Sequence, residues 1–261
     1  MGLFDGLEQL GFSELDKVDI LEKNEKRAPK EEKKKPEEEP DFYLVSKTVT
    51  CPVCGLDFID YVTRKSKLRV ESTDTDMRTI YHVIDANRYD VTLCVHCGYA
   101  AMNNIFDRIN DKQANEVIET VMPNYRGRTY SVPLTSEDAA ERYKLALLCA
   151  VARGAKSGEK GLLCLKTAWI YRGADDKKNE ILFIQTALKL FKDAFSSEPF
   201  PIGALDENAM QLLIAELSRR VGDFEEAKKW LGPVIVNRSL NSAIRNRAET
   251  IKELITAKKL I

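Results

Sequence analysis

Six cysteines are spread along the chain, and four of them are spaced so that they could hold a metal ion. Cys51 and Cys54 form one Cys-x-x-Cys-Gly hook, and Cys94 and Cys97 form a second, with 39 residues between the hooks. Four thiolates arranged as a tetrahedron make a closed zinc site that leaves no position for a substrate. The spacing therefore predicts a structural Zn²⁺ bound by these four residues.

The residues around the cysteines agree with this interpretation. Pro52 fixes its own backbone angle and helps to start a turn. Gly55 and Gly98 follow the second cysteine of each hook, where positive φ is expected. His96 is predicted to face solvent, the alternative being that it replaces one sulfur ligand. Zinc-binding pairs are usually separated by about 15–20 residues, so the longer interval predicts an extra hairpin between the hooks.

Three other interpretations of the hooks remain open: a disulfide pair, a redox dithiol and an iron–sulfur cluster. No secretion signal opens the chain, so the thiols are expected to stay reduced. A redox dithiol needs one Cys-x-x-Cys beside a βαβ pattern, which the sequence lacks. The two remaining cysteines, Cys149 and Cys164, lie in apolar helical patterns and are predicted to be core residues.

A second group with potential chemistry is Asp74, Asp76 and His82. Two aspartates two positions apart share one face of a strand and could serve a metal-dependent hydrolase, but a single histidine adds too few ligands. A solvated hairpin turn in which Arg78 pairs with an acid is favoured. With two histidines in all and no Ser–His or phosphate-loop motif, the chain is predicted not to be an enzyme.

Nucleic-acid binding is the alternative function. Residues 51–100 carry six basic and seven acidic side chains, and a zinc ion with four thiolates adds two negative charges, so a positive stripe is missing. Two local runs could still contact phosphates, and their residues are Arg64, Lys65, Lys67, Arg69, Arg126 and Arg128.

The elements that would position the hooks are short strands. Alternating residues predict strands near 43–45, 58–62, 67–71 and 89–93, and residues 99–121 are predicted to be helical. Together, residues 42–132 are predicted to form a zinc-ribbon-like module with a following helix.

Residues 133–261 are predicted to be all-α. Thr135 followed by acidic residues is a helix start, and Ile184, Leu188 and Phe191 repeat at helical spacing. The segment 222–227 resembles the turn and second helix of a tetratricopeptide repeat. The equivalent upstream turn lies 49 residues earlier instead of the usual 34, so the array is predicted to be tetratricopeptide-like. The predicted fold class is α+β.

The N-terminal region is predicted to have two parts. Residues 21–41 are mostly charged and contain prolines, which predicts a disordered linker. Residues 1–20 are predicted to be an apolar docking segment that binds the helical domain or a partner, through Leu3, Phe4, Leu7, Leu10 and Phe12.

Composition limits the remaining choices. The chain has 261 residues, enough for about two domains, and 44% of them are apolar. The 40 basic residues balance the 41 acidic residues, so no overall field attracts nucleic acid. No apolar run reaches the roughly 18 residues of a membrane helix. The protein is therefore expected to be cytoplasmic and not bound to a membrane.

Over nearly its full length the chain resembles a bacterial family, domain of unknown function 2225. The resemblance depends on the N-terminal motifs at 2–4 and 10–12, the first hook, the turn at 74–76, and Tyr89-Asp90 ahead of the second hook. It supports the architecture and leaves the activity open. We therefore expect a non-enzymatic zinc-binding adaptor whose helical domain binds a protein or peptide.

Overall fold

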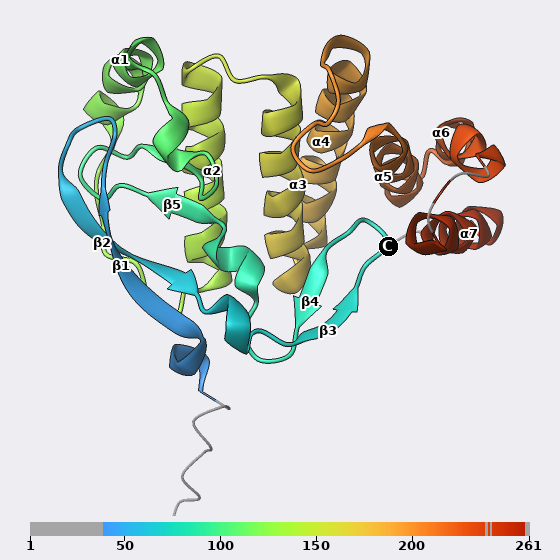
Figure 1. Cartoon of the computed structure of the whole chain (residues 1–261), viewed down its shortest axis with the longest axis horizontal. Coiled ribbons are helices and arrows are strands. Elements are labelled where there is room, and N and C mark those ends of the chain that lie inside the picture. Colours follow the sequence, from blue (N-terminus) through green and yellow to red (C-terminus); the bar gives the residue numbers. More distant parts are fainter. Residues whose placement is uncertain (1–38, 238–239, 241, 259–261) are drawn as a thin grey trace, which may run out of the picture. The chain divides into compact units, whose positions relative to one another are not determined.

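Three β-hairpins precede most of the helices in the computed structural model (Figure 1), which describes residues 39–237, 240 and 242–258. In each hairpin two consecutive strands pair antiparallel. The strands are β1 (Leu44–Thr50) with β2 (Asp57–Thr63), β3 (Val70–Thr73) with β4 (Thr79–Tyr81), and β5 (Val91–Leu93) with β6 (Ala100–Met102).

The predicted N-terminal docking segment, residues 1–20, lies outside the described residues together with its five apolar side chains. Residues 21–38 of the predicted linker lie outside them as well, and a short 3-10 helix, Pro40–Tyr43, leads into β1. The docking segment and the disordered linker both stay predictions.

The two hooks are the turns of the first and third hairpins. The ladder of β1 and β2 ends at the pair Thr50–Asp57, so the first hook closes that hairpin. The ladder of β5 and β6 ends at Leu93–Ala100, so the second hook closes the third hairpin. The hairpin β3–β4 lies between them in the chain, which confirms the prediction of an inserted hairpin.

Among the described residues, the rest of the chain is helical. Consecutive helices from α2 to α7 pack against each other as pairs, which confirms the predicted α+β class with a helical array after the hairpins. Thr135 and Asp138 form the expected capping box at the start of α2. The helices are α1 (Asp111–Thr120), α2 (Ser136–Ala152), α3 (Ser157–Gly173), α4 (Lys177–Ser197), α5 (Glu207–Arg220), α6 (Phe224–Val236) and α7 (Ser242–Thr256).

The prediction of one helix over residues 99–121 was wrong at its beginning. Strand β6 and a 3-10 turn, Phe106–Arg108, occupy the first part, and α1 starts only after Asn110. Strand β5 needs a partner strand for its backbone groups, and this requirement overrides the apolar spacing. The side chain of Asn110 then accepts a hydrogen bond from Gln113 N and caps α1.

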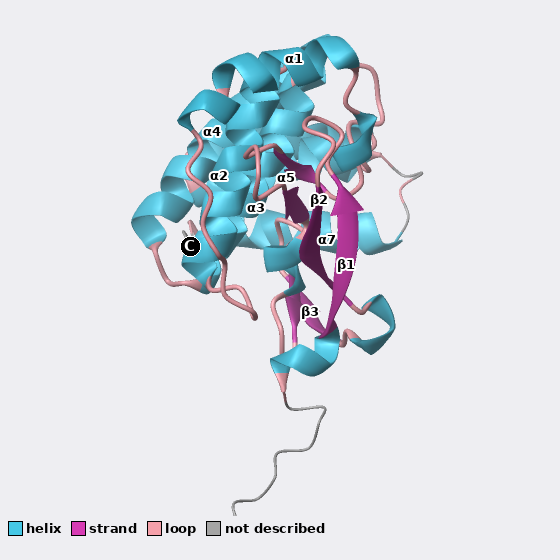
Figure 2. Cartoon of the chain, turned by 90° about the vertical axis from the view of Figure 1, so that its left-hand side faces the viewer, coloured by secondary structure: helices cyan, strands magenta, loops and turns pink. Residues whose placement is uncertain are grey.

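Figure 2 shows β1, β2 and β3 beside the helices, and the core of β5 and β6 is continuous with that of α2. Leu93 of β5 and Ala100 of β6 share a buried cluster with Tyr143 of α2. The Tyr143 hydroxyl donates a hydrogen bond to Asn87 O at 2.7 Å. The core therefore extends across the predicted domain boundary between residues 132 and 133. The division into two domains stays a prediction. Within the described part of the chain, no helix combines the length and the apolar character needed to span a membrane.

Candidate metal centre

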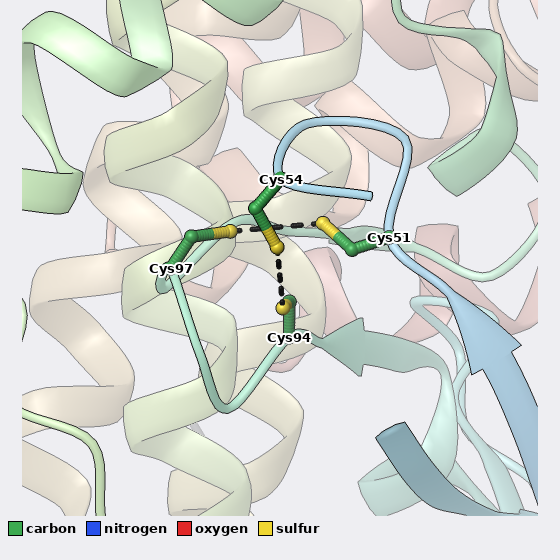
Figure 3. Close-up of side chains that lie close together, drawn as sticks. All are labelled: Cys51, Cys54, Cys94 and Cys97. Atoms are coloured by element: carbon green, nitrogen blue, oxygen red, sulfur yellow. Dashed lines mark hydrogen bonds between the residues drawn. The ribbon is translucent and has the colours of Figure 1, made fainter. Parts of the chain in front are cut away.

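The four cysteines of the hooks meet at one point (Figure 3). Their sulfur atoms all lie within 4.8 Å of one another, with Cys51 Sγ 3.6 Å from Cys97 Sγ and Cys54 Sγ 3.7 Å from Cys94 Sγ. A tetrahedral ion with metal–sulfur bonds of about 2.3 Å separates its ligands by about 3.8 Å. Two of the sulfur–sulfur distances thus match a four-thiolate metal site, and none exceeds 4.8 Å.

Both hooks reach this geometry through the same backbone hydrogen bonds. In each, the first cysteine N–H bonds to the carbonyl five residues on, and the glycine N–H returns to the carbonyl of the first cysteine. The two distances are 3.0 and 2.9 Å in the hook 51–56, and 2.9 and 3.0 Å in the hook 94–99. Gly55 and Gly98 have φ of 73° and 78°, as predicted. A Cβ on Gly98 would lie 2.5 Å from the ring of Tyr125, so a larger residue does not fit there.

Thiols of the cluster influence one another's ionisation. Thiol hydrogen bonds from Cys51 and Cys97 lower the pKa of Cys94 to about 2. The neighbouring Cys94, in turn, is the main cause that raises the pKa of Cys51 to about 12. Four sulfur atoms this close cannot all be thiolates unless positive charge lies among them, and metal binding releases their protons.

Most of the ligand residues are shielded from solvent. Cys51, Cys94 and Cys97 are buried and Cys54 is half-buried. His96 is exposed, with Nε2 3.1 Å from Asp57 O, and does not join the four sulfur atoms. Within the described residues, these four cysteines are the one group that could hold a metal ion.

The other two cysteines are core residues, as predicted, and all six are free thiols. Cys149 of α2 packs in the same cluster as the hooks, and its sulfur accepts a hydrogen bond from Ala100 N at 3.4 Å. Burial raises the pKa of Cys149 to about 11 and that of Cys164 to about 12, so both thiols stay protonated near neutral pH.

The acidic turn between β3 and β4 differs from its prediction. Asp76 is fully buried, and its carboxylate accepts hydrogen bonds from Arg172 Nη2 at 2.6 Å and Trp169 Nε1 at 3.1 Å. The expectation of a solvated turn is therefore wrong for Asp76. The expected pairing of Arg78 with an acid is confirmed, because its Nη2 lies 3.3 Å from Asp85 Oδ2.

This turn is docked onto α3 and α5, and Arg172 links it to α4. Arg172 of α3 also binds Asp74 at 2.7 Å and Glu180 of α4 at 2.6 Å. Thr75 donates to Glu216 of α5. Sequence reasoning missed these partners, although the spacing of Glu216, Arg219 and Arg220 at one helical turn was a visible signal. Burial by itself would raise the pKa of Asp76, but hydrogen bonds and charge from Arg172 outweigh it and hold that pKa below its usual value.

These contacts bear on the hydrolase alternative. Both carboxylates of the proposed group are bound to Arg172, and the side chain of His82 is exposed. The structure thus gives Asp74 and Asp76 a structural role in holding the hairpin.

The six basic residues proposed for nucleic-acid contact are all exposed. Arg64 Nε donates to Leu44 O at 2.8 Å, and Arg128 pairs with Glu141 at 2.9 Å and with Asp138 at 2.8 Å. Contact of these residues with phosphates stays a prediction.

A comparison with protein-family models gives one match. The model described as "Uncharacterized protein conserved in bacteria (DUF2225)" matches residues 44–255, from the start of β1 to the end of α7. No curated protein and no solved structure matches the chain. The match includes both hooks, the inserted hairpin and the helical array.

Proposed function

This chain belongs to the DUF2225 family, and we propose that it is a non-enzymatic adaptor: a Zn²⁺ ion stabilises its fold, and its helical array binds another protein or a peptide. The observation that carries the proposal is the closed cluster of four sulfur atoms, all within 4.8 Å of one another. Four protein ligands leave no coordination position for a substrate, which is typical of structural and not catalytic zinc.

The ligand set supports zinc as the ion. Four sulfur donors in a tetrahedron select zinc or iron among the common metals. Bound zinc contributes on the order of 10 kcal/mol to the folding of small modules. Each hairpin that carries a hook has only two strands, and an isolated two-stranded hairpin is marginally stable in water, so this contribution would stabilise both.

The helices supply the surface for a partner. Stacked helix pairs present extended surfaces that suit protein binding. Leu148 and Val151 lie one turn apart on α2 and are 51% and 58% exposed, so α2 presents adjacent apolar side chains to solvent.

Elemental analysis of the purified protein tests the metal. We expect one zinc ion per chain, and we expect Cys51→Ser and Cys94→Ser to lose it. Cys149→Ser is the matched control, because Cys149 packs beside the hooks without joining the four sulfur atoms. Iron in place of zinc, or a metal-free protein with four titratable thiols, would overturn the zinc assignment.

Cross-linking in cells tests the adaptor role. We expect the wild-type chain to capture a specific protein, and we expect the double substitution Leu148→Glu, Val151→Glu to abolish the capture. Lys144→Glu places the same side chain on the exposed face of α2 and should leave capture intact. Capture that is equal for all three proteins would show that this face of α2 is not the binding surface.

A further inference from the structure

A cavity of about 230 Å³ lies between β2 and the segment 128–134, and none of the four cysteines lines it. Its walls come from Ile59 and Asp60 of β2, Val95 of the second hook, Val132, and Arg142 of α2. Neighbouring residues of a strand point to opposite faces of the sheet. Since the cavity touches both Ile59 and Asp60 and no residue of β1 lines it, it follows the edge of β2 that faces away from β1.

This edge of β2 has backbone groups free to pair. Among the described strands, β1 is the one neighbour of β2. The bond from Cys51 N to Leu56 O continues the ladder, and pairing residues alternate along an antiparallel ladder. Ile59 and Tyr61 therefore direct their N–H and C=O groups away from β1. The Tyr61 N–H is bound by the Asp60 carboxylate at 2.9 Å. Both groups of Ile59 and the carbonyl of Tyr61 then have no backbone partner within the described part of the chain.

Arg142, which lines the cavity, carries an unsatisfied donor that is buried from solvent. Arg142 is 4% exposed, and its Nη2 binds both Asp60 oxygens, at 2.8 and 2.6 Å, and Val91 O at 2.7 Å. Its Nε–H has no acceptor among the described residues. A buried donor without an acceptor is destabilising, so the Arg142 Nε–H signal should report on a guest that fills the cavity.

Charge and size restrict the guest. Asp60 pairs with Arg142, and Arg128 at the rim pairs with Glu141 and Asp138. Each charged residue that lines the cavity is therefore already paired, which favours an uncharged guest. Complete small-molecule sites occupy about 300–1,000 Å³. The cavity is smaller, which fits a single apolar side chain of a longer ligand.

We propose that the cleft between β2 and the segment 128–134 binds an extended, uncharged segment of another protein, which adds as a strand to the free edge of β2. One large apolar side chain of that segment fills the cavity beside Ile59 and Val95. Main-chain hydrogen bonds to β2 supply affinity, and the cavity supplies selectivity, as in other complexes formed by strand addition. This site is separate from the apolar pair on α2 and does not depend on it.

The test is a titration of the full ¹⁵N-labelled chain with blocked pentapeptides Thr-Val-X-Val-Thr, X being Phe, Leu or Ser. We expect saturable shifts of the amides of Ile59 and Val95 and of the Arg142 Nε–H signal with Phe or Leu, and none with Ser. Ile59→Ser should weaken binding about tenfold, because it removes one apolar wall. Val70→Ser should leave binding unchanged, since Val70 is 61% exposed against 64% for Ile59 and does not line the cavity.

Several outcomes would overturn the proposal. One is the absence of saturable shifts with both apolar peptides, and another is equal binding of the Ser peptide. A third is binding of N-acetyl-phenylalaninamide as tight as that of the Phe peptide without a shift at the Ile59 amide, which would identify a small-molecule pocket. A fourth is a dimer in sedimentation whose interface protects the Ile59 amide, which would make a second copy the occupant.

Discussion

At the scale of single residues, two aspartates of one turn have different environments. The side chain of Asp74 is 28% exposed and binds Arg172 at 2.7 Å. Asp76 is fully buried and binds Arg172 and Trp169. Arg220 Nε also lies 3.7 Å from the Asp76 carboxylate. A charge lost from Asp76 would therefore remove a buried carboxylate that water cannot replace from beside Arg172 and Arg220, whereas a charge lost from Asp74 would be replaced partly by solvent.

We predict that Asp76→Asn lowers the free energy of unfolding by about 3 kcal/mol, the typical cost of removing one partner of a buried ion pair. Asp74→Asn is the same substitution in the same turn, and it should lower the free energy of unfolding by less than about 1 kcal/mol. Urea unfolding at neutral pH measures both values. Equal costs for the two substitutions would contradict the assignment of Asp76 as the main anchor of the hairpin.

At the scale of elements, the helices differ in their distance from the hooks. Val117 of α1 and Cys149 of α2 share a buried cluster with the cysteines. The core of α6 and α7, which includes Leu231 and Ile251, contains no hook residue. Stability is distributed over such clusters, which can open separately.

We predict that a strong zinc chelator raises hydrogen exchange in β5, β6, α1 and the buried face of α2, because these elements pack on the hooks. Exchange in α6 and α7 should change little. Hydrogen–deuterium exchange read by mass spectrometry gives both results in one experiment, and added zinc should restore protection. Unchanged exchange in β5 and β6 after removal of the metal would show that the ion does not hold the hairpins.

At the scale of the molecule, the hairpins and the helices depend on each other. A zinc-ribbon module that folded independently would unfold on loss of a zinc ligand and leave the helices intact. Leu93 and Ala100, however, lie in one core with Tyr143 of α2, and Arg142 joins α2 to Asp60 of β2. Loss of the hooks should therefore also destabilise α2.

The sequence by itself determined the features that depend on near neighbours. The Cys-x-x-Cys-Gly spacing, the positive φ at Gly55 and Gly98, and the cap at Thr135 each involve residues within one turn. Ligand chemistry predicted which four cysteines form the cluster. The long interval between the two hooks predicted the inserted hairpin. The helix predicted to begin at residue 99 was wrong for residues 99–110. The spacing of apolar residues in a short segment does not show that β5 requires a partner strand.

Only the tertiary structure decided the burial of Asp76, the pairing of Arg142 with Asp60 and the cleft along β2. The partners in these contacts are 96 and 82 residues apart in the chain. Coulomb attraction between two charges depends on where packing places them and on how far water is excluded. Neither quantity can be read from a local pattern, so the structure was needed to find the hairpin anchor and the free strand edge.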